Sequence, residues 1–377
     1  MKEKIIICLL VILTIFLGRG HVFANNNINE VSDALELESA LSTLQEYTTE
    51  LDLDSVAEDL IHGKGINYNS VIELFLNKIF HEIKLGLKTA LTMLIILILF
   101  SIIKSLELDK DGLIEKVVGL VGFIVISTML LKNYSNNIVL FTETVQTLSK
   151  IVGVISPLLM AILIATGEVV TSGIITPVLL LLTSVLGIII SYIIVPLLNI
   201  SLILKIITSI SSTVNLTKLS NTFKSFAMWI IGVAFALFIG VLGLETSVGT
   251  SVDSITVKTT QAAVSNLVPV VGKFLSDSAE IVMGASEIIG KSLGVIGIIV
   301  LIIVLLIPVI KLIVISLIYK LLEAFSEAML ADEKTTKLIG AFAKQYSSIV
   351  GIMIGVGATF IISIGIVINT LGKVSGG

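Results

Sequence analysis

Cysteine and arginine are almost missing from this 377-residue sequence, which contains one of each, Cys8 and Arg19. Both lie in the N-terminal stretch, where two lysines precede an apolar run over residues 5–17 and Val22-Phe23-Ala24 provides a small-x-small cleavage site. This pattern predicts a signal peptide over residues 1–24, with an uncleaved anchor as the alternative. Because cleavage after Ala24 would leave no thiol, it excludes disulfides and iron–sulfur or zinc–thiolate sites.

Charged residues are also scarce. They make up 14% of the chain, hydrophobic residues make up 55%, and the mean hydropathy is +1.08. Soluble domains are about 25% charged. A chain this apolar could not cover one globule with polar groups, so most of it must use lipid as its solvent. The composition therefore predicts a polytopic membrane protein.

Signatures of catalysis and of cofactor binding are absent as well. The sequence has no His-Glu-x-x-His, no Gly-x-Ser-x-Gly, no Walker loop and no intramembrane aspartate pair. His62 and His81 lack cysteine partners and are expected to be solvated surface residues, with no metal site. We therefore predict a protein that is not an enzyme and has no cofactor; a membrane-embedded peptidase would lack a catalytic pair.

Residues 25–84 form an acidic segment with twelve Asp or Glu against three Lys. Ser55-x-x-Glu58 and Ser70-x-x-Glu73 each have the capping-box pattern that starts a helix. We predict a small helical exported region here. Its negative charge would repel phosphate, so nucleic acid and anionic lipid are not expected partners of this segment.

Residues 85–377 are predicted to form a multi-span membrane domain, so the fold class is all-α and polytopic. Six hydrophobic segments are long enough to cross a bilayer. They are Leu85–Ile103, Leu113–Leu131, Gly173–Leu198, Phe226–Leu244, Leu293–Tyr319 and Ile349–Leu371. A seventh, Ile151–Ala165, is shorter and contains Pro157, so it is either a seventh crossing or a re-entrant element.

The distribution of lysines favours six crossings with Ile151–Ala165 turning back. With an exported N-terminal region, this topology places ten lysines on the inside, including those near 205–224 and 320–344. Seven crossings would instead place most of these lysines outside. The six-crossing topology also puts residues 245–292 on the same side as the acidic region.

The stretch Thr259–Tyr319 is the most unusual in the chain, because a polar, patterned segment runs directly into a long apolar one. Its first part predicts an amphipathic hairpin that lies on the membrane or dips into it. Its second part contains Pro308 and Lys311 within a membrane span. Lys311 either faces a water-filled path or a carboxylate, or it reaches the headgroups from one end of a tilted helix.

Two glycine pairs have the spacing that lets membrane helices approach closely. These are Gly290-x-x-x-Gly294 and Gly351-x-x-x-Gly355, which we consider packing candidates. Four prolines are expected to break or bend spans: Pro157, Pro177, Pro196 and Pro308. Glu168 is expected in a turn, with an ion path as the alternative.

The segment TTQAAVSNLVPVVGKFLSDSAEIVMG, continuing to LLIPVIKL, resembles the stage III sporulation protein AE family of endospore-forming bacteria. The residues that carry this resemblance, and that we take as partner-contact candidates, are Asn266, Pro269, Gly272, Ser276 and Asp277. The family also resembles this chain in its signal peptide, short exported region and multi-span body.

The resemblance implies a subunit of the membrane complex that the stage III A proteins form in the mother cell. That complex meets stage II sporulation protein Q across the intermembrane space as a channel or secretion-like apparatus, and another subunit supplies its ATPase. The expected partners are therefore membrane lipid, the other stage III A proteins, indirectly stage II sporulation protein Q, and further copies of the chain. The alternative hypothesis is a small-solute or ion transporter, motivated by the bent spans and Lys311.

Overall fold

The structure is a computed structural model that describes residues 37–48, 53–61, 68–105, 113–210, 214–267, 269–328 and 333–371. Helices account for nearly all of these residues, and none of them is in a strand. The helices are α3 (Leu37–Gln45), α4 (Leu53–Ile61), α5 (Tyr68–Ser105), α6 (Leu113–Ala165), α7 (Val169–Ile189), the π-helical turn η1 (Ile190–Ile194), α8 (Val195–Ile210), α9 (Thr217–Leu267), α10 (Pro269–Ala328) and α11 (Glu333–Ile368).

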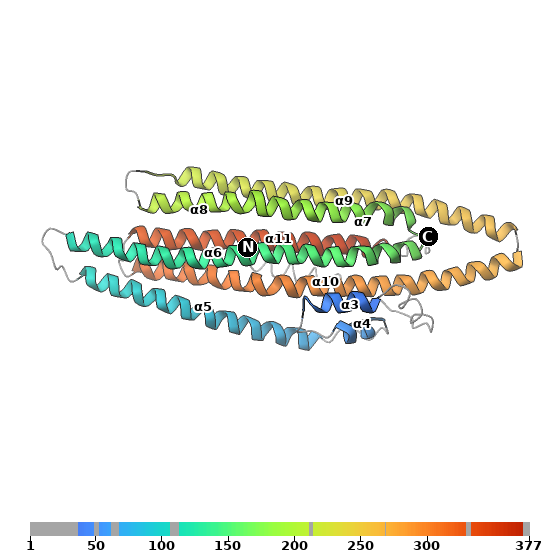
Figure 1. Ribbon diagram of the computed structural model, residues 1–377, viewed down its shortest axis with the longest axis horizontal. Helices are drawn as coiled ribbons and strands as arrows, with labels where there is room; N and C mark the ends of the chain where they lie inside the picture. The colour runs from blue at the N-terminus through green and yellow to red at the C-terminus, as the bar shows by residue number, and fades with distance from the viewer. Residues whose placement is uncertain are drawn as a thin grey trace.

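Six long helical rods run side by side along the longest axis of the molecule and alternate in direction (Figure 1). They are α5, α6, the continuous run α7–η1–α8, α9, α10 and α11. Among the described residues, these six are also the helices that are long and apolar enough to cross a membrane. The predicted fold class, an all-α polytopic membrane protein with six to seven spans, is confirmed in that the structure is all-helical with six helices long and apolar enough to span a membrane.

The expected seventh segment does not exist as a separate element. Residues 151–165 continue α6, which is unbroken over 53 residues and therefore about 80 Å long. Pro157 lies inside this helix with its ring on the exposed side, so the missing backbone donor does not disturb the packed face. Both alternatives for Ile151–Ala165, a re-entrant element and a seventh crossing, were wrong.

Two other prolines also lie within helices that continue through them, the exposed Pro177 in α7 and the buried Pro308 in α10. Within the described helices, the hydrogen-bond pattern widens at η1, where the Val195 amide donates to the Ile190 carbonyl, five residues back. This wider turn comes directly before Pro196, which cannot donate and whose ring would clash with a regular preceding turn.

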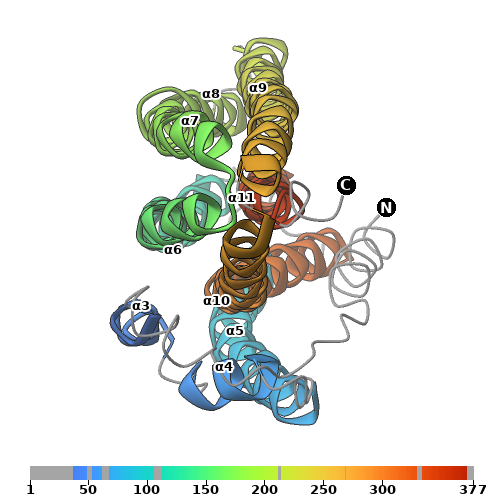
Figure 2. The same cartoon turned by 90° about the vertical axis from the view of Figure 1, so that its right-hand side faces the viewer.

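The rods form three groups when viewed along the long axis (Figure 2). The rods α7–α8 and α9 lie on one side, α6, α10 and α11 lie in the middle, and α5 lies on the other side with the short helices α3 and α4. The most extensive contact is between α10 and α11, and α10 also packs on α6 and α5. The core is therefore built around α10 and α11, whose apolar surfaces are mostly covered by other helices.

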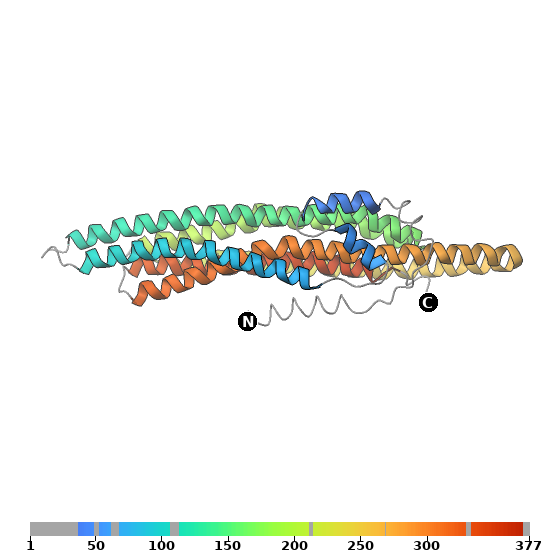
Figure 3. The same ribbon diagram turned by 90° about the horizontal axis from the view of Figure 1, so that it is seen from below.

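The alternation of directions separates the two ends of the bundle. The helices α5, α8 and α10 end at Ser105, Ile210 and Ala328 at one end of the bundle, which we call the loop end. The opposite end, which we call the hairpin end, has the turn after Ala165 and the junction between α9 and α10. The helices α3 and α4 lie beside the half of the bundle that is nearer the hairpin end (Figures 1 and 3).

Six lysines lie at one level of the bundle, because contacts between the rods fix their register. Asn133 donates to Tyr319, Tyr134 donates to Asn199, and Gly86 faces Ile318. We call this the lysine level; its lysines are Lys88, Lys132, Lys205, Lys224, Lys320 and Lys344. Along α9, the distance from Lys224 to the next charged residue toward the hairpin end, Glu245, is about 31 Å. Along α6, the distance from Lys132 to Lys150 is about 27 Å, with Glu143 as the one charged residue between them. These intervals match a hydrocarbon layer of about 30 Å.

The apolar stretches lie on both sides of the lysine level. Those of α7 to α9 extend from it toward the hairpin end, with exposed Leu181 and Leu237. Those of α5 and α6 extend toward the loop end, with exposed Ile95 and Ile124. The predicted spans Leu85–Ile103 and Leu113–Leu131 are thus offset from the others by most of a bilayer thickness. One flat lipid layer could not cover both apolar zones.

Candidate functional site

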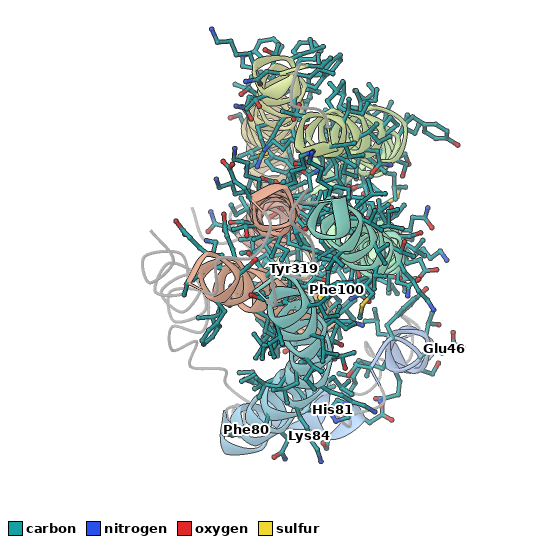
Figure 4. The ribbon with its side chains drawn as sticks, turned by 90° about the vertical axis from the view of Figure 1, so that its left-hand side faces the viewer. Glu46, Phe80, His81, Lys84, Phe100 and Tyr319 are labelled. Atoms are coloured by element: carbon teal, nitrogen blue, oxygen red, sulfur yellow. The ribbon has the colours of Figure 1, made fainter. Side chains whose placement is uncertain are left out.

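Three tyrosines form a buried cluster near the lysine level. Tyr134 of α6, Tyr319 of α10 and Tyr346 of α11 meet edge to face, with ring centroids 6.0 Å apart for Tyr134 and Tyr346 and 5.5 Å apart for Tyr319 and Tyr346. Figure 4 shows Tyr319 inside the bundle, whereas Phe80, His81 and Lys84 of α5 point away from it. Edge-to-face pairs add about 0.5–1.5 kcal/mol beyond the burial of the rings.

Asparagine side chains satisfy the tyrosine hydroxyls. Asn133 Nδ2 donates to Tyr319 Oη at 3.1 Å, and Asn137 Nδ2 donates to Tyr346 Oη at 3.2 Å. Tyr134 Oη donates to Asn199 Oδ1 of α8 at 2.8 Å. Polar bonds between membrane helices average about 0.6 kcal/mol and reach about 2. The network therefore fixes four rods in register.

The turn between α6 and α7 is held from a distant helix. Gly167 has φ 86°, a conformation that favours glycine, and reverses the chain. The buried Asp253 of α9 accepts hydrogen bonds from the amides of Val170 at 2.8 Å and Thr171 at 2.7 Å. A carboxylate at a helix N-terminus satisfies free amides and complements the helix dipole. Asp253 therefore caps α7 and ties it to α9.

Glu168 lies directly before α7, in the turn where it was predicted. Its side chain is fully buried, and its backbone amide donates to Leu163 at 2.7 Å. The carboxylates of Glu168 and Asp253 are therefore both associated with the start of α7, one from the turn before it and one from α9. Among the described residues no group of three His, Cys, Asp or Glu could hold a metal ion.

The first glycine pair lies on the buried face of α10. A Cβ at Gly290 would meet Ile162 and Leu371, and one at Gly294 would meet Ile368. The α10 backbone therefore approaches α6 and the end of α11 where a larger residue would not fit.

The second glycine pair behaves differently at its two positions. A Cβ at Gly355 would meet the ring of Phe235 on α9, whereas a Cβ at Gly351 would have nothing within 4 Å. Other glycines also lie at close contacts, among them Gly297 against Ile155 and Gly357 against Leu305. Spacing alone did not single them out.

Pro308 and Lys311 lie in the same unbroken helix but in different surroundings. Pro308 is buried, whereas Lys311 is half-buried. No carboxylate among the described residues forms an ion pair with Lys311. It lies nine residues from Lys320, about 13 Å along α10 from the lysine level. The structure therefore supplies no carboxylate partner for a charge path at this residue.

The predicted hairpin is formed by continuations of α9 and α10. Asn266 lies in the last turn of α9, and Pro269 is the first residue of α10. Gly272, Ser276 and Asp277 follow in the first three turns of α10. Figure 1 shows the two helices continuing along the bundle axis well past the ends of the other rods. Closer to the bundle, Lys291 pairs with Glu287 on α10.

The residue pairs that organise these sites were not found from the sequence. Asp253 is an isolated carboxylate among hydroxyl residues, and its targets Val170 and Thr171 lie more than 80 positions earlier. The cluster tyrosines are separated by up to 212 positions, with Tyr134 and Tyr346 at the extremes. The only available signal was the presence of amide and phenol side chains in otherwise apolar helices.

Comparison with known proteins gives one family. The family model described as Stage III sporulation protein AE matches residues 51–370, which include the hairpin, the tyrosine cluster and Asp253. The curated Stage III sporulation protein AE of Bacillus subtilis (strain 168) is 25% identical over 276 residues, which cover 73% of this chain and 69% of that protein. No solved structure matches the chain.

Proposed function

Because the chain belongs to the stage III sporulation protein AE family, we propose that it is a non-enzymatic membrane subunit of a channel or secretion-like complex. The complex would link the mother cell and the forespore and would be needed for late forespore development. The sporulation role follows from the family. The place in a complex is our proposal, and it depends on the shape of the bundle.

The observation that carries this proposal is the projecting hairpin of α9 and α10. Beyond Asp253, which binds the start of α7, α9 continues for about 21 Å to its end at Leu267. Because these helices continue along the bundle axis, a membrane around the span of α9 that ends at Glu245 would leave the hairpin outside. A pair of helices that leaves the bundle in this way has surface available for a partner.

The staggered apolar zones provide independent support. The exposed apolar surface of α5 and α6 and that of α7 to α9 extend in opposite directions from the lysine level. Since a single bilayer is too thin to cover both, protein must cover part of this surface. This is expected of a subunit in an assembly and not of a solitary permease.

We place the protein in the mother-cell membrane around the forespore, with the lysine-rich loop end in the cytoplasm. The hairpin and the acidic region would then lie in the intermembrane space. We propose the other stage III A proteins as direct partners there, together with further copies of the chain, and stage II sporulation protein Q as an indirect partner.

Reporter fusions test this orientation. Alkaline phosphatase fused after Thr171 or Thr260 should be active, and a cytoplasmic reporter should be active after Ser212. Because α7 starts at the hairpin end and α8 ends with Ile210 at the loop end, we expect opposite results at these fusion sites. Equal phosphatase activity at Thr171 and Ser212 would contradict the alternation of the rods.

A photo-crosslinking amino acid at Ser276 tests the partner surface in sporulating cells. We expect a covalent product with another protein of the complex from Ser276, and none from the same substitution at Val233, which is exposed on the apolar face of α9. Loss of spores after engulfment in a strain without the gene provides the functional control. Normal spore yield without the gene would refute the proposal.

A further inference from the structure

Three lysines from three different helices meet at the loop-end side of the bundle. They are Lys205 of α8, Lys224 of α9 and Lys344 of α11, which we call the lysine cluster. Lys224 Nζ donates to the Lys344 carbonyl at 3.0 Å. Lys205 is close enough to the other two for their charges to act on one another. Lys205 and Lys224 are half-buried, and Lys344 is exposed.

The packing of α8 on α9 explains why the side chains converge. The hydroxyls of Ser201 and Ser220 are 3.0 Å apart, and Ser220 Oγ also donates to the Ser201 carbonyl at 2.6 Å. Lys205 and Lys224 each come four residues after one of these serines, on antiparallel helices. Since helical side chains lean toward the N-terminus of their helix, the two lysines lean toward each other.

The third helix is held in place by the residue next to Lys344. Gln345 Nε2 donates to the Leu198 carbonyl of α8 at 2.9 Å, and both of these residues are buried. The cluster is therefore built on three helices whose register is fixed by buried hydrogen bonds. It is not a chance meeting of flexible surface side chains.

The charge of the cluster is not balanced within the part of the chain that the structure describes. No described carboxylate forms an ion pair with any of the three lysines, and the charges that act on Lys205 and Lys224 are those of lysines. Lys224 uses one of its three N–H donors on a carbonyl. Half-buried like charges repel one another and are costly to desolvate, so a bound anion would stabilise the arrangement.

The surroundings indicate which kind of anion the cluster would bind. On α9, Phe226 and Trp229 stack with ring centroids 6.2 Å apart, and both are more than half exposed. Trp229 lies five residues, about 7 Å, from Lys224 along α9 and about 140° around it, so it marks the height of the cluster from the outward side of the helix. Exposed tryptophan beside lysine marks a membrane interface, where basic pockets between helices bind lipid headgroups.

We propose that the lysine cluster is a binding site for a phosphate group, supplied by the headgroup of an anionic phospholipid between α8, α9 and α11. The Lys205 and Lys224 ammonium groups would hold the phosphate oxygens from two sides, and Lys344 would close the site from the exposed side. The acyl chains would extend from this height toward the hairpin end, along the exposed apolar surface of α7 to α9.

Trp229 is the single tryptophan of the chain, so its fluorescence reports on the lipid around α9 at the height of the cluster. The protein is placed in phosphatidylcholine nanodiscs that contain increasing fractions of brominated phosphatidylglycerol, and quenching is compared with that by brominated phosphatidylcholine. We expect the anionic lipid to quench at lower mole fraction, with about a fivefold loss of preference for each lysine of the cluster changed to Gln. The triple Lys→Arg variant, which keeps the charge, should retain a preference.

The matched control changes the exposed lysines Lys116, Lys218 and Lys320 to Gln, which removes the same charge from the loop end. If this control loses the preference as fully as the cluster variant does, generic surface charge is responsible and the proposal is wrong. An unchanged preference in the cluster variant would overturn it equally.

A second measurement identifies the source of the phosphate. Inorganic phosphate is added to nanodiscs without anionic lipid, and the thermal unfolding of the wild type and of the cluster variant is followed. Stabilisation of the wild type alone would support the site with a soluble phosphate as ligand, whereas a response to anionic lipid alone supports the headgroup. No response to either would refute a phosphate site.

Discussion

The cap that Asp253 places on α7 gives the most direct test of the structure. Asp253 is 2% exposed and accepts two charge-assisted bonds, from the amides of Val170 and Thr171. Hydrogen bonds to charged groups contribute about 1.5–3 kcal/mol each. In Asp253→Asn one oxygen remains and the amide nitrogen would face a donor, so we expect a cost of about 2 kcal/mol. Asp253→Ala leaves both backbone amides unpaired and should cost about 3–5 kcal/mol.

Hydrogen–deuterium exchange of the peptide that contains Val170 and Thr171 measures this cost locally. If exchange occurs through opening of the turn, 2 kcal/mol corresponds to about 30-fold faster exchange in Asp253→Asn, and Asp253→Ala should be faster still. Glu143→Gln is the matched control, because Glu143 is an exposed carboxylate of α6 outside this site.

The cap would be refuted if both Asp253 variants exchanged like the wild type at residues 170 and 171. It would also be refuted if Glu143→Gln accelerated exchange there to the same extent. An equal acceleration over the whole chain in the Asp253 variants would show global destabilisation. The predicted pattern is a local effect that is larger for Ala than for Asn.

Two further substitutions test the core, each by thermal unfolding in detergent followed by circular dichroism. Gly294→Leu should destabilise the protein by about 1–3 kcal/mol, because the leucine side chain would overlap Ile368. The control Gly351→Leu should have little effect, since the space there is open. Equal shifts of the unfolding temperature in the two variants would contradict the close contact of α10. Tyr346→Phe should cost about 1 kcal/mol by removing the acceptor of Asn137 while keeping the ring contacts. Tyr192→Phe, at an exposed ring, should be neutral, and a Tyr346→Phe protein as stable as wild type would show that the hydroxyl contributes nothing.

The sequence predicted the helical spans well, because each needs only an apolar run of sufficient length. It failed at Ile151–Ala165, where Pro157 and Lys150 suggested a break. The helix continues because the Pro157 ring lies on the exposed side and the opposite side packs on α10 and α11. Local preference was overridden by tertiary packing, which periodicity does not report.

The functional regions were predictable to different extents. The segment Thr259–Ser292 was selected from its polar pattern; in the structure it belongs to α9 and α10, which project past the other rods, while its last residues, from Ser286, are packed in the bundle. The glycine spacing identified Gly290 and Gly294, which lie at close contacts, and also Gly351, which does not. The lysine cluster was not anticipated, because Lys205, Lys224 and Lys344 appeared in the sequence only as charges in separate loops.

What the sequence determined by itself is the class of the protein: a chain with so few charges and so many long apolar runs must fold as helices in lipid. The alternation of six rods also follows, because short connections between long helices leave no other direction. Only the tertiary structure decided the register of the rods. Register depends on contacts such as Asn133 with Tyr319 and Ser201 with Ser220, whose partners are far apart or on different helices. It sets the height of the hairpin, the offset of the apolar zones and the meeting of three lysines.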